Sequence, residues 1–372
     1  MPDAGLPGCH RTNLAGWPLD VLLSGLPAMI RSALAVVAFF FAAAPALAQP
    51  YSSRRAGDVV RLTDARARTT VSILTSVGNI AFEMNVNGQN VLYWPYPSIE
   101  DFKARPGMSG IPFLGPWIDR LDEQAFFANG RRRAFDMQLG NVRGDMPSHG
   151  FITTTDRWTV VETTADAGAA WVRSRLEFYR QPLWMKQWPF AHTIEITHRL
   201  HDGVLEVETA IVNMSAEPMP IAIGFHPYFQ LTDSPRDAWT LSVGARTHWL
   251  LTSNKVPTGE TEPIERFFPT PRAAALGDYS LDDVFTDLVR DSEGRATVAV
   301  SGQSQHLEIG LGPNYRAVTI WSPKDRPFIC VEPMAGITDA INMAQKGQYK
   351  ELQTIAPGGT WRESFWIKPS GF

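Results

Sequence analysis

The sequence predicts an all-β protein, a large antiparallel β-sandwich. Short segments in which apolar and polar residues alternate follow one another along the chain, turn residues separate them, and helical periodicity is scarce. The composition agrees, because 28 prolines and 29 glycines supply many turns and 12 tryptophans suit a β-rich core. We therefore expect one large domain over residues 49–372, with long connections that are free to build a cleft on one face.

The first 48 residues are expected to lie outside this domain. Arg31 precedes an unbroken apolar run over residues 33–44, and Ala46-Leu47-Ala48 follows. A basic residue, a short apolar run and a small-x-small motif are typical of a signal peptide that is removed on export, and the run is too short to span a bilayer comfortably. We expect cleavage after Ala48. The mature protein is then periplasmic or secreted and has no further contact with the membrane.

Two alternatives remain for this leader. Translation from Met29 instead of Met1 would give a signal peptide of normal length, whereas an uncleaved leader would act as a membrane anchor. Removing 48 residues from 372 leaves 324, which is enough for one large domain. Cys330 is the only cysteine in those residues, so that no intramolecular disulfide is expected and the core alone must hold the fold together.

The charge balance and the motifs that are missing exclude several classes of protein. Thirty-four basic residues against 38 acidic ones give a net charge of -4, which offers no reason to expect nucleic acid as a partner. The sequence has no Walker A loop, no Gly-rich dinucleotide fingerprint and no G-x-S-x-G elbow. We expect no cofactor. A metal site on His192, His198 and His201 is disfavoured, because the first two share a strand face with Ile194 and Ile196.

The predicted strands begin near the start of the domain. Residues 69–78 are rich in β-branched side chains and end at a glycine. Two short apolar runs then flank Asn87-Gly88, which is a strong signal for a β-hairpin. Helical turns are expected only in short stretches such as residues 99–104.

The alternation is clearest in the middle of the chain. Val172, Ser174, Leu176 and Phe178 share one face of a predicted strand. Residues 191–200 and 203–214 alternate in the same way, and the intervening His201-Asp202-Gly203 predicts a turn. Three further strand-like segments close the chain, at residues 316–323, 327–333 and 364–369.

Four segments hold polar side chains where packing alone does not explain them. In the first, Asp119 and Arg120 follow an apolar, proline-bounded run, and taken alone they favour a surface ion pair at the end of a strand. In the second, His149 precedes Gly150, which allows another backbone to approach closely. An ordinary hydrogen-bonded loop histidine explains the second segment equally well.

In the third segment, His226 lies between Phe225 and Pro227 at the end of an apolar run. Proline has no N–H and fixes its own φ, so it is expected to end the strand pairing and hold the imidazole at the margin of a sheet. Histidine exchanges protons near neutral pH and can serve as a general acid or base. A histidine that is merely packed at a strand end is the alternative.

In the fourth segment, strand alternation places Phe328, Cys330 and Glu332 on one face. A carboxylate that ends a buried strand is costly unless it is paired or used. Burial raises the pKa of such a group towards the range that suits a general base. An ion pair with a nearby arginine is the alternative interpretation.

Five short motifs occur in order between about Val71 and Phe365: PWIDRL, SHGF, GFHPYF, LDDVF and CVEP. Each is weak alone, but the ordered set resembles the aldose 1-epimerase, or galactose mutarotase, family. That family is marked by a segment ending in Asn-Arg, a His-Gly-Phe element, a Gly-x-His-x-Tyr-Phe element, an Asp-polar-x-Phe element and a strand with Glu-Pro. The resemblance implies the large antiparallel sandwich known as the galactose mutarotase-like supersandwich, in agreement with the strand pattern.

The resemblance also implies a reaction and a site. The protein would interconvert the α and β anomers of a free aldose, with a monosaccharide as its partner, without a cofactor or metal, and as a monomer or weak dimer. His226 would be the general acid on the ring oxygen and Glu332 the general base on the anomeric hydroxyl. His149 would bind near the ring oxygen, while Arg120 and Asp282 would hold sugar hydroxyls. These five side chains must then meet around one sugar-sized pocket.

The chain departs from the family pattern at two positions. Asp119 stands where the family usually has asparagine, and Asp283 stands where it often has histidine. Both differences bear on which sugar is preferred. An aromatic wall from Trp117, Tyr228 or Phe229 is expected to stack on the apolar face of the sugar.

Three other functions were weighed against this one. A non-catalytic sugar-binding protein on the same fold would not need both His226 and Glu332. A hexose-6-phosphate 1-epimerase would need an arginine cluster for the phosphate, and export separates it from a mainly cytosolic substrate. A glycosidase would need two facing carboxylates, which Glu332 and Asp282 could supply, but the two histidines fit that chemistry poorly.

Overall fold

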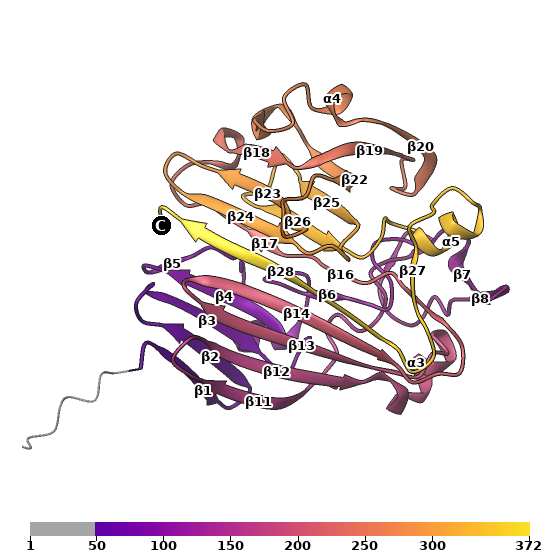
Figure 1. Cartoon of the computed structure of the whole chain (residues 1–372), viewed down its shortest axis with the longest axis horizontal. Helices are drawn as coiled ribbons and strands as arrows, with labels where there is room; N and C mark the ends of the chain where they lie inside the picture. The colour runs from indigo at the N-terminus through magenta and orange to yellow at the C-terminus, as the bar shows by residue number, and fades with distance from the viewer. Residues whose placement is uncertain (1–48) are drawn as a thin grey trace, which may run out of the picture. The chain divides into compact units, whose positions relative to one another are not determined.

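The structure of the protein, a computed structural model, describes residues 49–372, which form one compact unit. The expected leader and its cleavage site after Ala48 lie outside the described residues. Antiparallel strands make up most of the unit, and its helices are short (Figure 1). The predicted all-β class is therefore confirmed.

Two of the three large sheets have five and nine strands. The five-stranded sheet has, in order, β1 (Tyr51–Ala56), β2 (Val59–Asp64), β3 (Thr69–Leu74), β4 (Ile80–Val86) and β5 (Gln89–Asn90). The nine-stranded sheet has, in order, β11 (Thr159–Ala165), β12 (Ala170–Glu177), β13 (His192–His201), β14 (Val204–Asn213), β28 (Thr360–Ser370), β24 (His306–Leu311), β23 (Ala296–Ser301), β18 (Thr240–Val243) and β21 (Ala274–Ala275).

A third sheet carries most of the residues singled out above. Its path is β20 (Pro257–Pro263), β19 (Ala245–Leu251), β22 (Leu281–Leu288), β25 (Ala317–Ser322), β26 (Ile329–Met334), β16 (Gly224–Phe225) and β6 (Phe113–Leu114), and β17 (Tyr228–Phe229) also pairs with β26. Three two-stranded ribbons complete the strands: β7 (Ala125–Ala128) with β8 (Arg131–Ala134), β9 (Val142–Arg143) with β10 (Met146–Pro147), and β15 (Met219–Ile221) with β27 (Gln353–Ile355).

The core lies between the nine-stranded sheet and the other two. One buried apolar cluster contains Val71 of β3, Ile196 of β13 and Ile320 of β25, one residue from each large sheet. In Figure 1 the nine-stranded sheet runs from β11 up to β18, with β1 and β2 beside its lower strands, which they contact. Burial alternates residue by residue along β13, as expected for a strand with one face in the core.

Two of the predicted turns are hairpin turns in the structure, and one of them is shorter than predicted. Asn87 and Gly88 form the hairpin between β4 and β5, with φ values of 51° and 91°, as a type I′ turn requires. His201 differs from expectation, because it is the last residue of β13 and pairs with Val204, which leaves Asp202-Gly203 as the two-residue turn. A strand that extends to the turn residue gains one more ladder pair, which explains the difference.

The helices connect strands and are short. They are α2 (Ile99–Ala104), α3 (Pro182–Gln187), α4 (Ile264–Phe267), α5 (Ala340–Gln345) and the 3-10 turns η2 (Asp122–Gln124), η3 (Phe178–Arg180), η4 (Arg236–Ala238) and η5 (Leu276–Asp278). The expected helical stretch at residues 99–104 is α2, and the Ser98 side chain caps it by accepting a hydrogen bond from Asp101 N at 3.1 Å. Within residues 49–372, no helix has the length and apolar character needed to cross a bilayer.

Candidate active site

A break in one strand holds His226. Strands β16 and β17 are two short pieces on either side of His226-Pro227, and both pair with β26. Proline cannot donate to the ladder, which explains why the pairing stops there and resumes afterwards. Gly224 lies opposite Met334 and Tyr228 lies opposite Cys330. His226 lies midway between Gly224 and Tyr228, and Glu332 lies midway between Met334 and Cys330. The register therefore places His226 opposite Glu332.

This register brings the two side chains into contact. His226 Nε2 lies 3.2 Å from Glu332 Oε1, and the two residues are 5% and 1% exposed. The backbone N–H of His226 donates to the carbonyl oxygen of Pro112, the residue before β6, at 3.0 Å. This N–H is therefore hydrogen-bonded although the strand is interrupted. The expected end of strand pairing after His226 is present only as an interruption, and the imidazole lies within the sheet and not at its margin, because β16 is flanked by β26 and β6 and the pairing resumes at Tyr228.

The His149 loop reaches the same place from another segment. His149 has a positive φ of 57°, its N–H donates to Asp119 O at 2.6 Å, and its ring centroid lies 5.6 Å from that of His226. A Cβ on Gly150 would lie 1.9 Å from the carbonyl oxygen of Gly115. The predicted close backbone approach at Gly150 is therefore present, and only glycine permits it.

Arg120 and Asp282 approach from two further directions. The backbone of Arg120 is held by Thr338, whose Oγ1 accepts from its N–H at 3.3 Å, and by Asp339, whose N–H donates to its carbonyl at 3.1 Å. Asp282 lies on β22, directly opposite Trp321 of β25. Lys255 Nζ donates to the carbonyl oxygen of Asp282 at 3.0 Å and lies 3.8 Å from its Oδ2.

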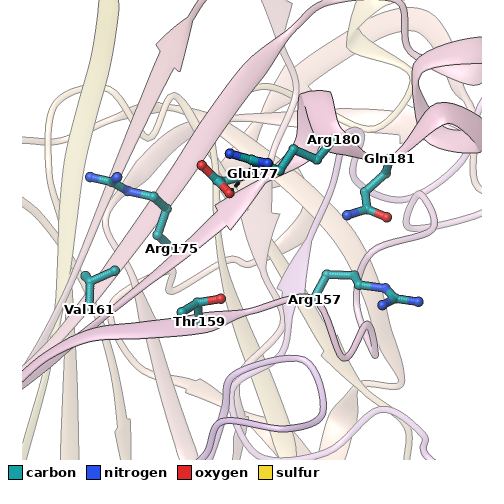
Figure 2. A pocket seen from close by; sticks show the side chains of 7 residues that line it. All are labelled: Arg157, Thr159, Val161, Arg175, Glu177, Arg180 and Gln181. Atoms are coloured by element: carbon teal, nitrogen blue, oxygen red, sulfur yellow. Dashed lines mark ion pairs between the residues drawn. The ribbon is translucent and has the colours of Figure 1, made fainter.

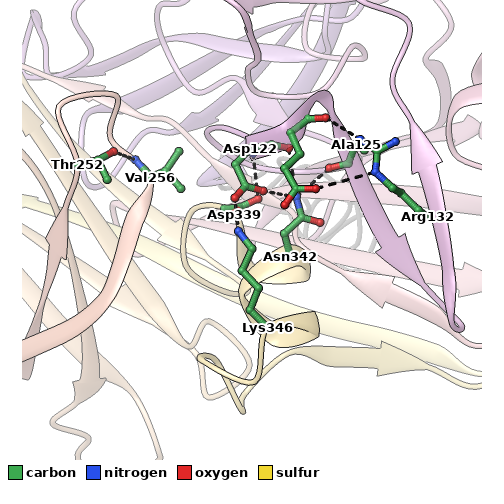
Figure 3. Close-up of polar contacts among 9 residues, drawn as sticks. Asp122, Ala125, Arg132, Thr252, Val256, Asp339, Asn342 and Lys346 are labelled. Atoms are coloured by element: carbon green, nitrogen blue, oxygen red, sulfur yellow. Dashed lines mark hydrogen bonds and ion pairs between the residues drawn. The ribbon is translucent and has the colours of Figure 1, made fainter.

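A cluster of polar side chains links the segment that carries Arg120 to α5. The N–H of Asp122 donates to Asp339 Oδ1 at 3.2 Å, Asn342 donates to Asp122 Oδ1 at 2.8 Å, and Lys346 forms an ion pair with Asp122 (Figure 3). Burial, reinforced by the charge of Asp122, raises the pKa of Asp339 to about 8. The loop that follows β26 is thereby tied to the segment that carries Arg120.

All five predicted site residues line one pocket. Eight side chains form it: Asp119, Arg120, Arg143, His149, His226, Asp282, Trp321 and Glu332. The expected convergence is present, although these residues come from five separate parts of the chain. The expected size is wrong, because the space between the side chains is about 20 Å³, room for about one water molecule. A sugar ring at His226 and Glu332 therefore has to extend beyond this pocket.

Two lining residues were not predicted. Arg143 belongs to the β9–β10 ribbon, whose sequence has neither periodicity nor a recognisable motif. Trp321 shares a face of β25 with Thr319, and Thr319 lies opposite Glu332. The alternation along β25 was visible in the sequence, but the pairing that brings this face to the cleft was not.

The predicted aromatic wall is largely wrong. Trp117 and Phe229 are 1% and 0% exposed and belong to the main core, where apolar neighbours bury them. Tyr228 stacks on the ring of His226 at 4.8 Å between centroids, so it supports the imidazole. The half-buried Trp321 lines the pocket, with its ring centroid 5.6 Å from that of His226.

The two departures from the family pattern have different positions. Asp119 lines the pocket, and burial raises its pKa to about 6. Asp283 follows Asp282 on a strand and therefore faces the other way. Its Oδ1 lies 3.1 Å from His248 Nε2, and its Oδ2 accepts from the N–H of Asp282 at 2.9 Å.

Burial controls the protonation of the central pair. It raises the pKa of Glu332 well above its usual range, an effect that the charges of Asp119 and Asp282 reinforce. Burial also lowers the pKa of His226 to about 3. Both shifts favour the neutral forms, in which the one proton that the two side chains can exchange is on the Glu332 carboxyl and Nε2 of the neutral imidazole is its acceptor.

Several buried polar atoms face this site without a hydrogen-bond partner among residues 49–372. They are Glu332 Oε2, His226 Nδ1 and His149 Nδ1. Burial lowers the pKa of His149 well below its usual range, and the electrostatic effect of His226 is the next largest cause. The His149 ring is therefore neutral. Buried polar atoms are normally paired, so unpaired ones in a pocket are suited to a hydrogen-bonding ligand. In the described part of the chain, no group of three or more His, Cys, Asp or Glu side chains is arranged to hold a metal ion.

Another arginine-bearing hollow lies on the solvent side of β11 and β12 (Figure 2). Its volume is about 240 Å³, and none of the predicted site residues lines it. Each of its arginines lies within ion-pair distance of a carboxylate: Arg157 of Asp156, Arg175 of Glu195 and Arg180 of Glu177. These charges are neutralised at an exposed surface, so the buried His226–Glu332 pair marks the stronger candidate site.

The antiparallel sandwich of residues 49–372 has the galactose mutarotase-like fold. The sequence profile of the aldose 1-epimerase family matches residues 58–368, and the chain belongs to this family. This membership supports an isomerase of the epimerase type, with a sugar as its substrate.

Solved structures with the same fold agree with this membership. A galactose mutarotase-like protein from Clostridium acetobutylicum has a TM-score of 0.76 and 20% identity, over 87% of this chain and 98% of that one. Galactose 1-epimerase from Lactobacillus acidophilus NCFM has a TM-score of 0.67 and 16% identity, over 86% of this chain and 98% of that one. At these identities the likeness shows the fold.

Proposed function

We propose that the protein interconverts the α and β anomers of a free aldose, with Glu332 as the general base and His226 as the general acid. The observation that carries this proposal is the 3.2 Å contact between Glu332 Oε1 and His226 Nε2 inside a polar pocket. The anomeric hydroxyl and the ring oxygen are bonded to the same carbon. An acid and a base that touch each other can therefore reach both oxygens at once.

The reaction needs only proton transfers and one bond rotation. Glu332 removes the proton of the C1 hydroxyl while His226 protonates the ring oxygen, and the bond between C1 and the ring oxygen breaks to give the open-chain aldehyde. Rotation about C1–C2 exposes the other face of the carbonyl. The ring hydroxyl then attacks C1, returning its proton to His226, while Glu332 gives its proton back to the new anomeric oxygen.

The resting protonation state fits this cycle after one internal transfer. Ring opening requires an ionised Glu332 and a protonated His226, whereas burial favours the proton on Glu332. Moving that proton along the 3.2 Å contact creates the reactive form without exchanging a proton with solvent. The total number of protons on the pair remains one.

Other pocket residues would hold the sugar. Arg120, His149 and Asp282 offer hydrogen bonds to hydroxyls, and the indole of Trp321 offers an apolar face to the C–H side of the ring. Asp119, whose pKa burial raises to about 6, can accept or donate near neutral pH. By the leader motif, we place this activity in the periplasm or outside the cell, after cleavage of the signal peptide.

Polarimetry tests the proposal directly. Purified protein is added to freshly dissolved aldoses, and the return of optical rotation to equilibrium is followed against a blank without protein. The rate for at least one aldose should rise in proportion to protein concentration. A protein that binds an aldose but leaves the blank rate unchanged would instead be a sugar-binding module on this fold.

A further inference from the structure

We propose that the preferred substrate is an aldose with an anionic substituent, a carboxylate or a phosphate, which Arg120, Arg143 and Lys255 bind on the side of the sugar away from C1. This inference rests on the proposed function, because it names the substrate class of the same site. It arises from a second hollow that adjoins the His226–Glu332 pocket.

The two hollows share a wall. The second has a volume of about 260 Å³ and is lined by Arg120, Arg143, Gly144, Asp145, Met146, Ser253, Asn254 and Lys255. Arg120 and Arg143 also line the pocket of about 20 Å³ that contains His226 and Glu332. Because that pocket has room for only about one water molecule, a sugar whose C1 reaches the pair extends out of it. The second hollow, which shares Arg120 and Arg143 with the pocket, is adjoining space that the rest of the sugar can occupy.

The two guanidinium groups in this shared wall are free of protein partners. Within residues 49–372, neither Arg120 nor Arg143 has a carboxylate oxygen within 4.0 Å or a side-chain hydrogen bond. The arginines of the hollow in Figure 2 are, in contrast, all ion-paired. Unpaired guanidinium groups suit a ligand anion, because each can form two parallel hydrogen bonds to a carboxylate or phosphate.

Acidic side chains around the two hollows offset part of this charge, but within residues 49–372 none of them pairs directly with Arg120 or Arg143. Asp282 and Lys255 partly neutralise each other, because Lys255 Nζ lies 3.8 Å from Asp282 Oδ2 and donates to its carbonyl oxygen. The unpaired positive charge is therefore carried mainly by the two arginines, with the remaining N–H donors of Lys255 beside them. Asp145 is exposed on the turn between β9 and β10. Asp119 and Glu332 lie in the adjoining pocket. Burial raises the pKa of Glu332 well above its usual range and so reduces its negative charge, whereas Asp119, whose pKa burial raises to about 6, stays mostly ionised at neutral pH.

The three cationic side chains come from segments that are held in place independently. The Arg120 backbone is bonded to Thr338 and Asp339, as described above. Arg143 lies in a two-stranded ribbon, paired with Met146. Lys255 lies in a turn closed by Thr252, whose Oγ1 accepts from Val256 N at 3.2 Å and whose carbonyl accepts from Lys255 N at 2.9 Å (Figure 3).

The test compares neutral and anionic aldoses with the same stereochemistry. Anomerisation rates are measured with glucose, glucuronate and glucose 6-phosphate, and with galactose, galacturonate and galactose 6-phosphate, at low and high salt and with blanks for each sugar. For at least one kind of anionic sugar, we expect kcat/KM to be higher than for the matching neutral sugar, mainly because KM is lower. The uronates and the phosphates separate a carboxylate site from a phosphate site. The preference should shrink at high salt, because Arg143 is exposed.

Charge-removing variants locate the preference. Arg143→Gln and Lys255→Gln should each lower the ratio of kcat/KM for the anionic sugar to that for the neutral sugar by about tenfold, the usual scale for one charge-assisted hydrogen bond. Arg157→Gln, in the ion-paired hollow of Figure 2, is the matched control and should leave this ratio as it is. Thermal unfolding of each variant checks that it is folded.

The outcomes separate this inference from the proposed function. If neutral aldoses are converted as fast as both anionic kinds and neither variant changes the ratio, the anionic site is wrong and the proposed function stands. If no sugar of either kind is converted, the proposed function itself is wrong. Conversion of an anionic sugar with a preference that Arg143→Gln and Lys255→Gln reduce supports both.

Discussion

His226, in the gap between β16 and β17, lies opposite Glu332 of β26, and their Nε2 and Oε1 atoms lie 3.2 Å apart. The contact follows from strand register, because Pro227 interrupts one strand without shifting the pairing on either side. A shift of one residue would turn one of the two side chains to the other face of the sheet. The register of the sheet thus fixes the position of this pair.

The pH dependence of kcat/KM should be a broad bell. At low pH the pair takes up a second proton on His226, whose pKa burial lowers to about 3. At high pH it loses its single proton from Glu332, whose pKa burial raises well above its usual range. Activity should therefore persist below the pKa of about 6.5 of an ordinary histidine. Rates between about pH 3 and 10, corrected for the blank, test this, and an acid limb centred on an ordinary histidine pKa would contradict it.

Gly150→Ala should destabilise the fold more than Gly57→Ala. The two glycines have φ values of 62° and 61°, but a Cβ on Gly150 would lie 1.9 Å from Gly115 O, whereas one on Gly57 has no atom within 4 Å. The left-handed conformation alone costs about 1–2 kcal/mol, so Gly57→Ala measures that part. Gly150→Ala should cost at least about 2 kcal/mol more, as a buried clash does. Urea unfolding gives both values, and equal losses would show that the approach is not tight.

Asp339→Asn should stabilise the protein at alkaline pH. Burial raises the pKa of Asp339 to about 8 in the folded state, from an ordinary value of 3.8, so the folded state binds more protons between these values. The wild type therefore loses stability as pH rises from about 4 to about 8. The variant lacks this loss and should have the higher free energy of unfolding at about pH 8, by at least about 1 kcal/mol, but not at about pH 4.

The control for Asp339→Asn is the exposed Asp278→Asn, which removes one carboxylate from the surface. It should follow the wild type at both pH values. If Asp339→Asn lowers the free energy of unfolding equally at both, then the carboxyl group serves as a hydrogen-bonding partner of Asp122 and its ionisation is unimportant.

The leader should be removed on export. Arg31, the apolar run at residues 33–44 and Ala46-Leu47-Ala48 predict that the mature protein begins at Gln49. N-terminal sequencing of protein from the periplasmic fraction measures this. Intact protein that starts at Met1 or Met29 in a cytosolic fraction would contradict the prediction.

The strands were predictable because they depend on local rules, whereas the pairing of His226 with Glu332 followed only from the resemblance to the family. Two-residue periodicity marks β13, the Asn87-Gly88 pair marks a hairpin, and Pro227 marks the break beside His226. Gly150 was also predictable as a site of close approach, although the sequence does not show that the approaching backbone belongs to Gly115.

The cationic side of the site was not predictable. Arg143 and Lys255 lie in a ribbon and a turn, where no periodicity relates a side chain to a face of the fold. The choice of aromatic wall failed for a related reason. Trp117 and Phe229 look like Trp321 in their local sequences, and only the packing of the sheets decides which aromatic ring meets the core and which meets the cleft.

Glu332→Gln tests the central claim most directly, because it keeps the shape of the side chain and removes the base. Anomerisation rate and sugar affinity are measured together, with the exposed Glu260→Gln as a control and His226→Asn as the matching change in the acid. The account predicts that Glu332→Gln lowers the turnover rate by roughly two to four orders of magnitude, with a far smaller change in affinity. A Glu332→Gln protein that converts anomers at nearly the wild-type rate would contradict it.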